Sequence, residues 1–238
     1  MLALSLRQGF CCCVYLCVFL MSFQAIAKDE DSAIVEQIKR AVVVVTTFDV
    51  KGKPLAQGSG FFISANRIVT NFHVIKNSGS VQVKIYKSKV LTVAKIIAFN
   101  DRRDIALLEL NQSPANICVL PIVESPPQEG SQIFVVSNPR GSSWKVTKGN
   151  AESVWDFQGI GELLQISAAI HPGSSGGPVT NDKGQVVGIA VMRTNSAIDL
   201  NFAIPAIAIK ELQENLSNDS QASNEIKRSL RLENLNTH

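Results

Sequence analysis

Residues 171–178 read His-Pro-Gly-Ser-Ser-Gly-Gly-Pro and lie between two apolar runs of a 238-residue chain. Glycines on both sides of a serine let the backbone approach another group closely and adopt angles that a Cβ forbids. In such a turn the amides of Gly173 and Ser175 can point at one position, where they would stabilise the oxyanion of a tetrahedral intermediate. A plain Gly-Ser hairpin turn gives the same letters, so a catalytic interpretation needs partners elsewhere in the chain.

A serine hydroxyl becomes a strong nucleophile when a general base accepts its proton, and the chain contains 3 histidines. His73 follows Thr70-Asn71-Phe72 at the end of a predicted strand and precedes a predicted loop. His171 is four residues before Ser175, in a Pro-Gly turn that tends to aim its ring away from the serine, and His238 is terminal. His73 is therefore the predicted base.

A carboxylate completes the constellation. Asp104 stands where an apolar run, residues 105–110, begins, although the charges at 101–103 beside it have the pattern of an ordinary loop. A buried aspartate that accepts the Nδ1–H of a histidine fixes the tautomer and offsets the imidazolium charge. With this residue the order along the chain is His73, Asp104, Ser175, with separations of 31 and 71 residues.

Short β-branched runs extend outward from these residues, with Gly, Pro, Asn and Ser between them. Because no strands alternate with long helices, the pattern predicts an all-β barrel or sandwich. Prolines concentrated at 114–127 predict a crossover between two β halves. Short helices are predicted before residue 41, within 28–40, and from Pro205 to Leu212. The predicted strands are Val42 to Phe48, Phe61 to Ile63, Arg67 to Thr70, Val81 to Tyr86, Val90 to Phe99, Ile105 to Leu110, Ile133 to Val136, Trp144 to Val146, Leu163 to Ile166, Val186 to Val191 and Asn201 to Ile204.

The first 27 residues have the features of a secretory signal peptide: Arg7, an apolar run from Phe10 to Phe23, and Ala25-Ile26-Ala27. An apolar helix of that length rises about 21 Å, short of the roughly 30 Å hydrocarbon core of a bilayer. We therefore expect cleavage after Ala27, no stable membrane span afterwards, and a periplasmic or secreted protein. An uncleaved anchor is the alternative, since residues 2–6 are also mostly apolar.

Composition excludes several other classes of function. Four of the 5 cysteines lie in the leader, so Cys118 alone would remain, and it cannot form an internal disulfide. Three separated histidines give no metal-ligand spacing and no Gly-rich phosphate loop precedes a helix, so no cofactor or metal is expected. The net charge is only +3, and we expect no nucleic-acid partner because basic and apolar residues alternate as on a solvated strand face at Lys84, Lys87, Lys89 and Lys95.

Over most of Ala41 to Lys210 the sequence resembles the trypsin-like serine peptidases of the bacterial HtrA/DegP type. The resemblance implies two perpendicular six-stranded antiparallel β-barrels within a domain of 41–210, at about 41–118 and 119–205. His73 and Asp104 would come from the first barrel and Ser175 from the second. The matching motifs are, in order, Gly58-Ser59-Gly60-Phe61, Thr70-Asn71-Phe72-His73-Val74, Asp104-Ile105-Ala106-Leu107-Leu108, Asn138-Pro139-Arg140-Gly141, Val146-Thr147-Lys148-Gly149, Gln165 to Pro178, Val187-Gly188-Ile189-Ala190 and Asn201-Phe202-Ala203-Ile204-Pro205.

The chain departs from this family pattern at several positions. Ser174 and His171 each stand where Asn is usual, Ser137 replaces a usual Gly, and Ile166-Ser167 replaces Thr-Asp. Ser174, the residue before the predicted nucleophile, is uncharged, so we expect no activation by an ion pair between this position and a new N-terminal amine. We therefore expect activity without a cut beyond signal removal, unless loop movement gates the site. The residues after the domain, 211–238, form a polar tail with no room for a PDZ domain.

The resemblance implies a serine endopeptidase that acts on exported or unfolded proteins, in protein quality control, through an acyl-enzyme. The pocket would be lined by Ala169, Ile170, Leu200, Asn201 and Phe202. None of these is charged, so a small or medium aliphatic side chain fits better than a buried cation.

Two further expectations concern this pocket. Asp199 is the nearby acid that could overturn the aliphatic preference. An edge strand over residues 200–203 would pair with extended polypeptide substrates.

Two other functions share part of this sequence pattern. A peptidase fold kept as a binding or chaperone module, with weak or absent catalysis, is the alternative function. An esterase of the α/β-hydrolase fold is disfavoured, because it would need Ser before Asp before His and a helix after the serine. The sequence predicts no oligomeric state.

Overall fold

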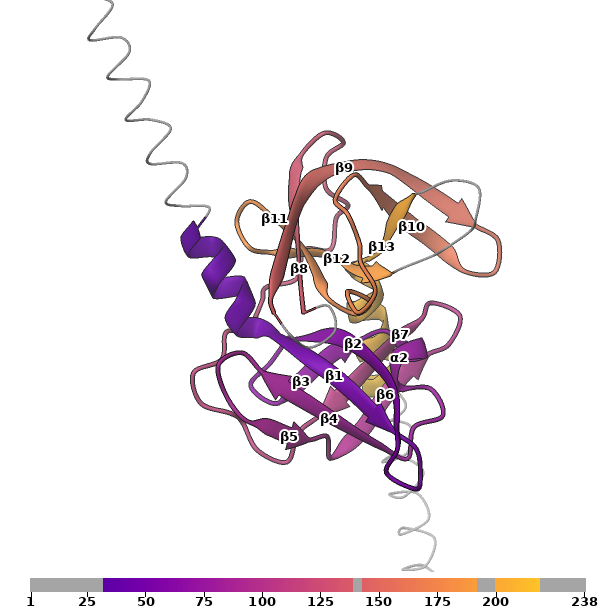
Figure 1. Cartoon of the computed structure of the whole chain (residues 1–238). Coiled ribbons are helices and arrows are strands. Elements are labelled where there is room, and N and C mark those ends of the chain that lie inside the picture. Colours follow the sequence, from indigo (N-terminus) through magenta and orange to yellow (C-terminus); the bar gives the residue numbers. More distant parts are fainter. Residues whose placement is uncertain (1–31, 139–142, 192–199, 219–238) are drawn as a thin grey trace, which may run out of the picture.

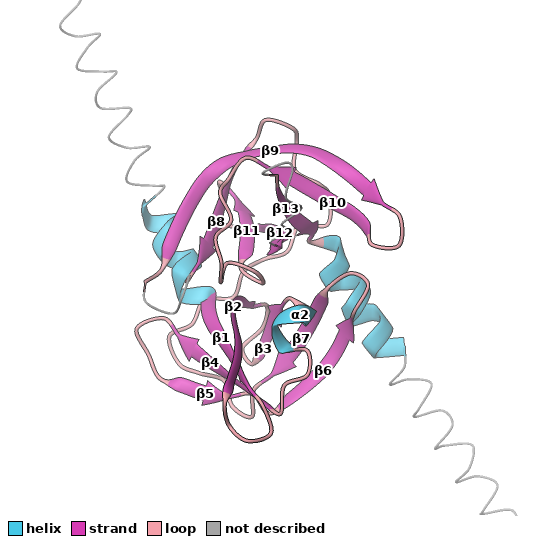
Figure 2. Ribbon diagram, turned by 45° about the vertical axis from the view of Figure 1, so that its right-hand side comes forward, coloured by secondary structure: helices cyan, strands magenta, loops and turns pink. Residues whose placement is uncertain are grey.

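The computed structural model describes residues 32–138, 143–191 and 200–218. It is nearly all-β, with two β units stacked one above the other and a helix at each end, over residues 32–41 and 207–218 (Figures 1 and 2). The C-terminal helix continues past Leu212, where it was predicted to end, so the first residues of the predicted polar tail, 211–218, are helical. None of the helices in these ranges is long and apolar enough to span a membrane. The leader, 1–27, lies outside the described residues.

The first unit is a seven-stranded sheet in the order β5-β4-β1-β2-β3-β7-β6. The inner strand β1 buries four consecutive valines, which explains why this apolar run is a strand with neighbours on both sides. The strands are β1 (Val42–Phe48), β2 (Pro54–Phe62), β3 (Arg67–Thr70), β4 (Ser80–Ile85), β5 (Val90–Thr92), β6 (Lys95–Asn100) and β7 (Ile105–Glu109).

The first unit has one strand more than predicted, because the single strand predicted over residues 90–99 is two strands, β5 and β6. The chain bends between β5 and β6 and changes its pairing partner. The Val93 N–H donates to the Val81 carbonyl beside β4, and the Ala94 N–H donates to the Glu109 carbonyl of β7, each at 2.9 Å. The two end strands of the sheet are thus successive halves of one bent strand, and the first unit is an open sheet rolled toward a barrel.

The second unit is a closed antiparallel barrel in the order β10-β13-β12-β11-β8-β9, which confirms the predicted six-stranded barrel. Closure places β13 between β10 and β12, so the expectation that residues 200–203 form an edge strand is wrong. The backbone groups of β13 form hydrogen bonds with the two neighbouring strands of the barrel. The strands are β8 (Gln132–Ser137), β9 (Lys145–Phe157), β10 (Gly161–Ile166), β11 (Pro178–Asn181), β12 (Val186–Val191) and β13 (Asn201–Pro205).

One apolar core, here called the shared core, joins both units and both terminal helices. Half-buried Cys118 packs against it, outside any strand. One smaller cluster fills the interior of each unit. Because the shared core takes side chains from both units and from both terminal helices, it fixes how the two units face one another. Its buried members are Ile38, Ala41, Val42, Phe61, Val69, Ile105, Leu107, Leu120, Val136, Leu163, Val186, Ile189, Val191, Phe202, Ile204, Ala206, Ala208, Ile209 and Leu212.

Candidate active site

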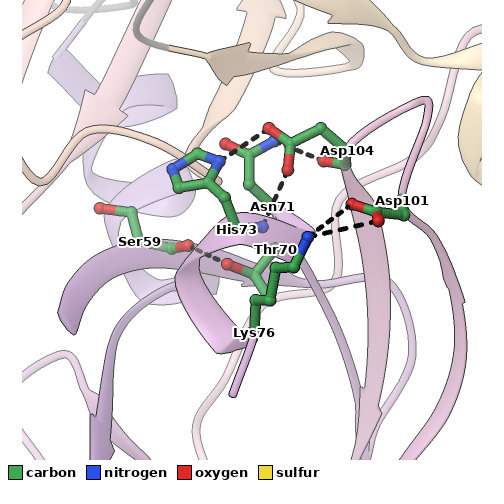
Figure 3. Close-up of polar contacts among 7 residues, drawn as sticks. All are labelled: Ser59, Thr70, Asn71, His73, Lys76, Asp101 and Asp104. Carbon is green, nitrogen blue, oxygen red and sulfur yellow. Dashed lines mark hydrogen bonds and ion pairs between the residues drawn. The ribbon is translucent and has the colours of Figure 1, made fainter. Parts of the chain in front are cut away.

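His73 lies on α2 (Phe72–Ile75), a single helical turn where a loop was predicted. Its ring Nδ1 is 2.7 Å from Oδ2 of Asp104, and its backbone N–H donates to Oδ1 of the same carboxylate at 2.8 Å (Figure 3). A carboxylate accepts hydrogen bonds and has no proton to give, so Nδ1 must carry the hydrogen. The lone pair of the neutral ring is then on Nε2, which can act as a base.

The backbone of Asp104 is also fixed by a hydrogen bond. It precedes β7 with φ +55°, a left-handed conformation that aspartate tolerates better than most residues. Its backbone carbonyl accepts a hydrogen bond from Nδ2 of Asn71 at 2.9 Å, and Asn71 is fully buried. Asn71 therefore ties the residue before α2 to the residue before β7. Sequence reasoning quoted Asn71 only as part of a motif and gave it no role.

Two charged neighbours of Asp104, Asp101 and Arg103, form contacts away from His73. Asp101 forms an exposed ion pair with Lys76, at 3.3 Å (Figure 3). The Arg103 guanidinium reaches across to the second unit, where it lies 3.4 Å from the carbonyls of Ile160 and Glu162. Within this loop, Asp104 is the residue that contacts the His73 ring, as predicted.

Ser175 belongs to the second unit and is 7% exposed. Its backbone carbonyl accepts a hydrogen bond from the Ser59 N–H of β2 at 2.8 Å. A Cβ on Gly58 would lie 2.9 Å from that carbonyl oxygen and 2.7 Å from the Val74 side chain, next to His73. Since neither distance leaves room for a side chain, the loop that carries the serine meets β2 backbone to backbone.

Gly176 extends the same contact toward His73. Its φ is +87°, and a Cβ there would lie 2.2 Å from the Ser59 carbonyl oxygen and 3.0 Å from the Asn71 nitrogen. Thr70 Oγ1 donates to that Ser59 carbonyl at 2.7 Å (Figure 3). The serine loop therefore packs against the residues that lead into α2. The fold brings the neighbourhoods of all three predicted catalytic residues to one place between the two units.

The predicted oxyanion donors lie in the same loop. Gly173 has φ +90°, and its carbonyl accepts a hydrogen bond from Ser59 Oγ at 2.8 Å. Its own N–H has no acceptor among the described residues. An amide in that situation can bind an incoming oxygen atom.

The predicted pocket residues fall into two groups. The Ile170 N–H donates to Oδ1 of Asn201 at 3.1 Å, which joins the serine loop to β13, and Ala169 beside it is exposed. Phe202 lies on the other face of β13 from Asn201 and is buried in the shared core, and Leu200, just before the strand, packs against that core. Both stand outside the buried cluster that contains Ile170. Asp199 is outside the described residues.

A model of the trypsin-like peptidase domain family matches residues 58–189. The chain belongs to this family. The trypsin-like peptidase is similar to relatives of the HtrA/DegP type, and its nearly all-β two-unit fold agrees with that resemblance.

Three relatives of this trypsin-like peptidase illustrate the similarity. The anti-sigma-I factor RsgI9 of Acetivibrio thermocellus is 32% identical over 187 residues, which are 78% of this chain and 26% of the relative. A probable periplasmic serine endoprotease, DegP-like, of Chlamydia muridarum is 32% identical over 179 residues, 70% of this chain and 35% of the relative. The solved structure of a serine endoprotease from Yersinia pestis is 26% identical, with a TM-score of 0.68, and the match covers 80% of this chain and 67% of that one. The chain thus spans about a quarter and about a third of the length of these two curated relatives.

Two departures of this trypsin-like peptidase from the family pattern contact each other. The hydroxyl oxygens of Ser137 and Ser174 are 2.9 Å apart, and both side chains are buried. The His171 N–H also donates to Ser174 Oγ, at 3.2 Å. A pairing between residues that are 37 positions apart could not be found from the sequence.

Within the described ranges, no group of three or more His, Cys, Asp or Glu side chains could hold a metal ion.

Proposed function

We propose that this chain is a serine endopeptidase in which His73, Asp104 and Ser175 act together. The observation that carries the proposal is the double contact between His73 and the Asp104 carboxylate, which leaves the lone pair of the ring on Nε2. The loop that carries Ser175 packs against the residues that lead into α2, where His73 lies. Membership of the trypsin-like peptidase family supports it.

In the proposed reaction Ser175 Oγ attacks the carbonyl carbon of a peptide bond while its proton moves to Nε2 of His73. The Asp104 carboxylate stays ionised and stabilises the imidazolium. The negative oxygen of the tetrahedral intermediate is bound by the amides of Gly173 and Ser175. When the C–N bond breaks, His73 gives the proton to the departing amine and an acyl-enzyme remains. Water then attacks the ester with His73 again as the base, and the proton returns to Ser175.

The proposed substrates are polypeptide segments of exported or unfolded proteins, cleaved after small or medium aliphatic residues. Ala169 and Ile170 precede the serine loop, and the side chain of Asn201 on β13 contacts Ile170. Several curated relatives are named as probable periplasmic serine endoproteases, which supports an exported location for this one. The predicted signal peptide, 1–27, is part of this proposal.

A fluorophosphonate probe on the purified protein tests the proposed nucleophile. We expect covalent labelling of the wild type and none of Ser175→Ala. Labelling that persists in Ser175→Ala would move the nucleophile, with Ser174 as the next candidate. No labelling of the wild type would favour the alternative of a catalytically weak binding or chaperone module.

Synthetic peptides that differ only in the residue before the scissile bond test the pocket. We expect kcat/KM to be higher with Val or Leu than with Arg, since a cation would be buried without a partner. Faster cleavage after Arg would contradict the pocket assignment.

A further inference from the structure

Three buried serine hydroxyls surround the peptide that links Gly173 to Ser174. Ser59 lies on β2 of the first unit, Ser137 ends β8 of the second, and Ser174 precedes the proposed nucleophile. Their side chains are nearly inaccessible, since the residues are 0%, 3% and 1% exposed. Burying a hydroxyl is unfavourable unless it is hydrogen-bonded, so the contacts of each one matter.

The Ser59 hydroxyl both donates and accepts a hydrogen bond. Its oxygen accepts a hydrogen bond from the Asn138 N–H at 3.3 Å, and its single proton goes to the Gly173 carbonyl at 2.8 Å. A residue of the first unit therefore fixes the direction of a carbonyl in the serine loop of the second unit.

The other side of the same peptide is also fixed. The Ser174 N–H donates to the His171 carbonyl at 2.8 Å, and Ser174 Oγ is held by the Ser137 hydroxyl and the His171 N–H. Rotation of the 173–174 peptide by half a turn would break the bonds of both its C=O and its N–H. Each buried group left unpaired costs about 1–3 kcal/mol. With this peptide pinned and φ of Gly173 at +90°, the direction of the Gly173 N–H is set.

We propose that Ser59 and the Ser137–Ser174 pair are positioning residues that hold the Gly173 N–H where the oxyanion forms. The inference rests on the proposed function, since it assigns these hydroxyls to the proposed oxyanion site. They act through the peptide backbone and do not touch the substrate.

The first test compares Ser59→Ala with Thr47→Ala. Thr47 is the matched control, because its hydroxyl is also buried, donates to one carbonyl and accepts from one amide, those of Ala56. It pairs β1 with β2 and makes no contact with the serine loop. We expect Ser59→Ala to lower kcat about tenfold or more with little change in KM, because misplacing an oxyanion donor acts on the transition state. Thr47→Ala should lower the melting temperature and leave kcat unchanged per folded active site.

A pair of inhibitors separates positioning from general loosening of the site. The aldehyde Ac-Ala-Ala-Pro-valinal forms a tetrahedral adduct with the serine, whose oxygen occupies the oxyanion position, whereas the alcohol Ac-Ala-Ala-Pro-valinol does not. In Ser59→Ala the inhibition constant of the aldehyde should rise by the same factor by which kcat/KM falls, and that of the alcohol should stay constant. Equal weakening of both inhibitors would overturn the positioning role.

A double-mutant cycle tests the second anchor. Ser137→Ala and Ser174→Ala should each lower kcat, and the double variant should be no worse than the more damaging single variant, because one contact is lost in all three. Fully additive effects would contradict a paired role. If the wild type reacts with the fluorophosphonate but Ser59→Ala behaves like Thr47→Ala, this inference alone fails. If the wild type does not react, the proposed function fails with it.

Discussion

The Asp104 carboxylate makes two contacts with one residue, and that pair of contacts locates a proton. Oδ1 accepts from the backbone of His73 and Oδ2 from its ring. The backbone bond fixes which oxygen faces the ring, so the carboxylate cannot rotate without losing a partner. The histidine is thereby held in the tautomer that a general base requires.

Asp104→Asn should reverse this tautomer. The His73 N–H needs an oxygen at the Oδ1 position, so the new amide must present its NH₂ group to the ring, and a donor there forces the ring hydrogen onto Nε2. We expect kcat to fall by about 10⁴ with an aliphatic peptide substrate, while urea denaturation changes little. Asp101→Asn is the control: its exposed pair with Lys76 should be worth about 1 kcal/mol or less and leave kcat unchanged. Full activity of Asp104→Asn would remove Asp104 from the mechanism.

Gly176→Ala should destabilise the protein far more than Gly52→Ala. Both glycines have positive φ, +87° and +81°, so the backbone strain of an added Cβ, about 1 kcal/mol, is common to both. The new methyl group meets nothing within 4 Å at Gly52, but lies 2.2 Å from the Ser59 carbonyl oxygen at Gly176. Free energies of unfolding from urea titration should therefore differ by several kcal/mol. Similar losses at the two sites would contradict the close packing of the serine loop on β2.

Residues that carry reactive groups could be predicted from the sequence, and residues that only hold them could not. His73 is one of 3 histidines, Asp104 stands directly before an apolar run and Ser175 lies among glycines, so each could be picked out from its local sequence. Asn71 contacts Asp104 across 33 positions, and Ser59 contacts Gly173 across 114. Nothing local in the sequence marks such partners.

At the scale of elements, β-branched runs predicted most strands well, and the bounds of β1, β3 and β12 agree with the prediction. The prediction failed where burial is not the cause of the strand. Most of β9 is exposed, with Ala151 its one fully buried residue among thirteen, so its sequence reads as loop. Two other elements escaped prediction for different reasons. The strand β11 is mostly buried, but it begins at Pro178 directly after a glycine-rich turn, and α2 is one turn without a side-chain cap.

The N-terminal helix should depend on pH through Glu36. The hydrogen bond from Tyr86 Oη, 2.8 Å long, and then the charges of Lys87 and Lys39 hold the pKa of Glu36 below its ordinary 4.5, against the opposing effect of partial burial. A lowered folded-state pKa means that the contribution is fully present above about pH 4.5 and is lost as the pH falls through the folded value.

Tyr86→Phe should therefore lower the free energy of unfolding near pH 7. The loss should be under about 1 kcal/mol, because the carboxylate is largely exposed. The difference from the wild type should shrink below pH 4. In a Glu36→Gln background, which has no titrating group there, the effect of Tyr86→Phe should not vary between pH 3 and 7. A constant difference in both backgrounds would show that the Tyr86 contact does not depend on the charge of Glu36.

At the scale of the whole molecule, the shared core makes the two units one folding unit. Ile38 of the N-terminal helix is fully buried in it, and its side chain lies 3.8 Å from where a Cβ on Gly184 of the second unit would stand. Ile38→Ala should cost about 2–5 kcal/mol. Calorimetry should still give one transition, with equal calorimetric and van't Hoff enthalpies, because neither unit keeps its packing when the other unfolds. Two separate transitions in the wild type would contradict a common core.

The contact between Gly58, Gly176 and the two opposing carbonyls bears on how this protein can vary. At that point the base-bearing and nucleophile-bearing halves meet main chain to main chain, so a side chain added at either glycine would push them apart. Substitutions elsewhere on the surface can therefore remodel selectivity without retuning the reactive centre. A mutagenesis library that spares these two glycines and diversifies the surrounding loops should retain a high fraction of working clones.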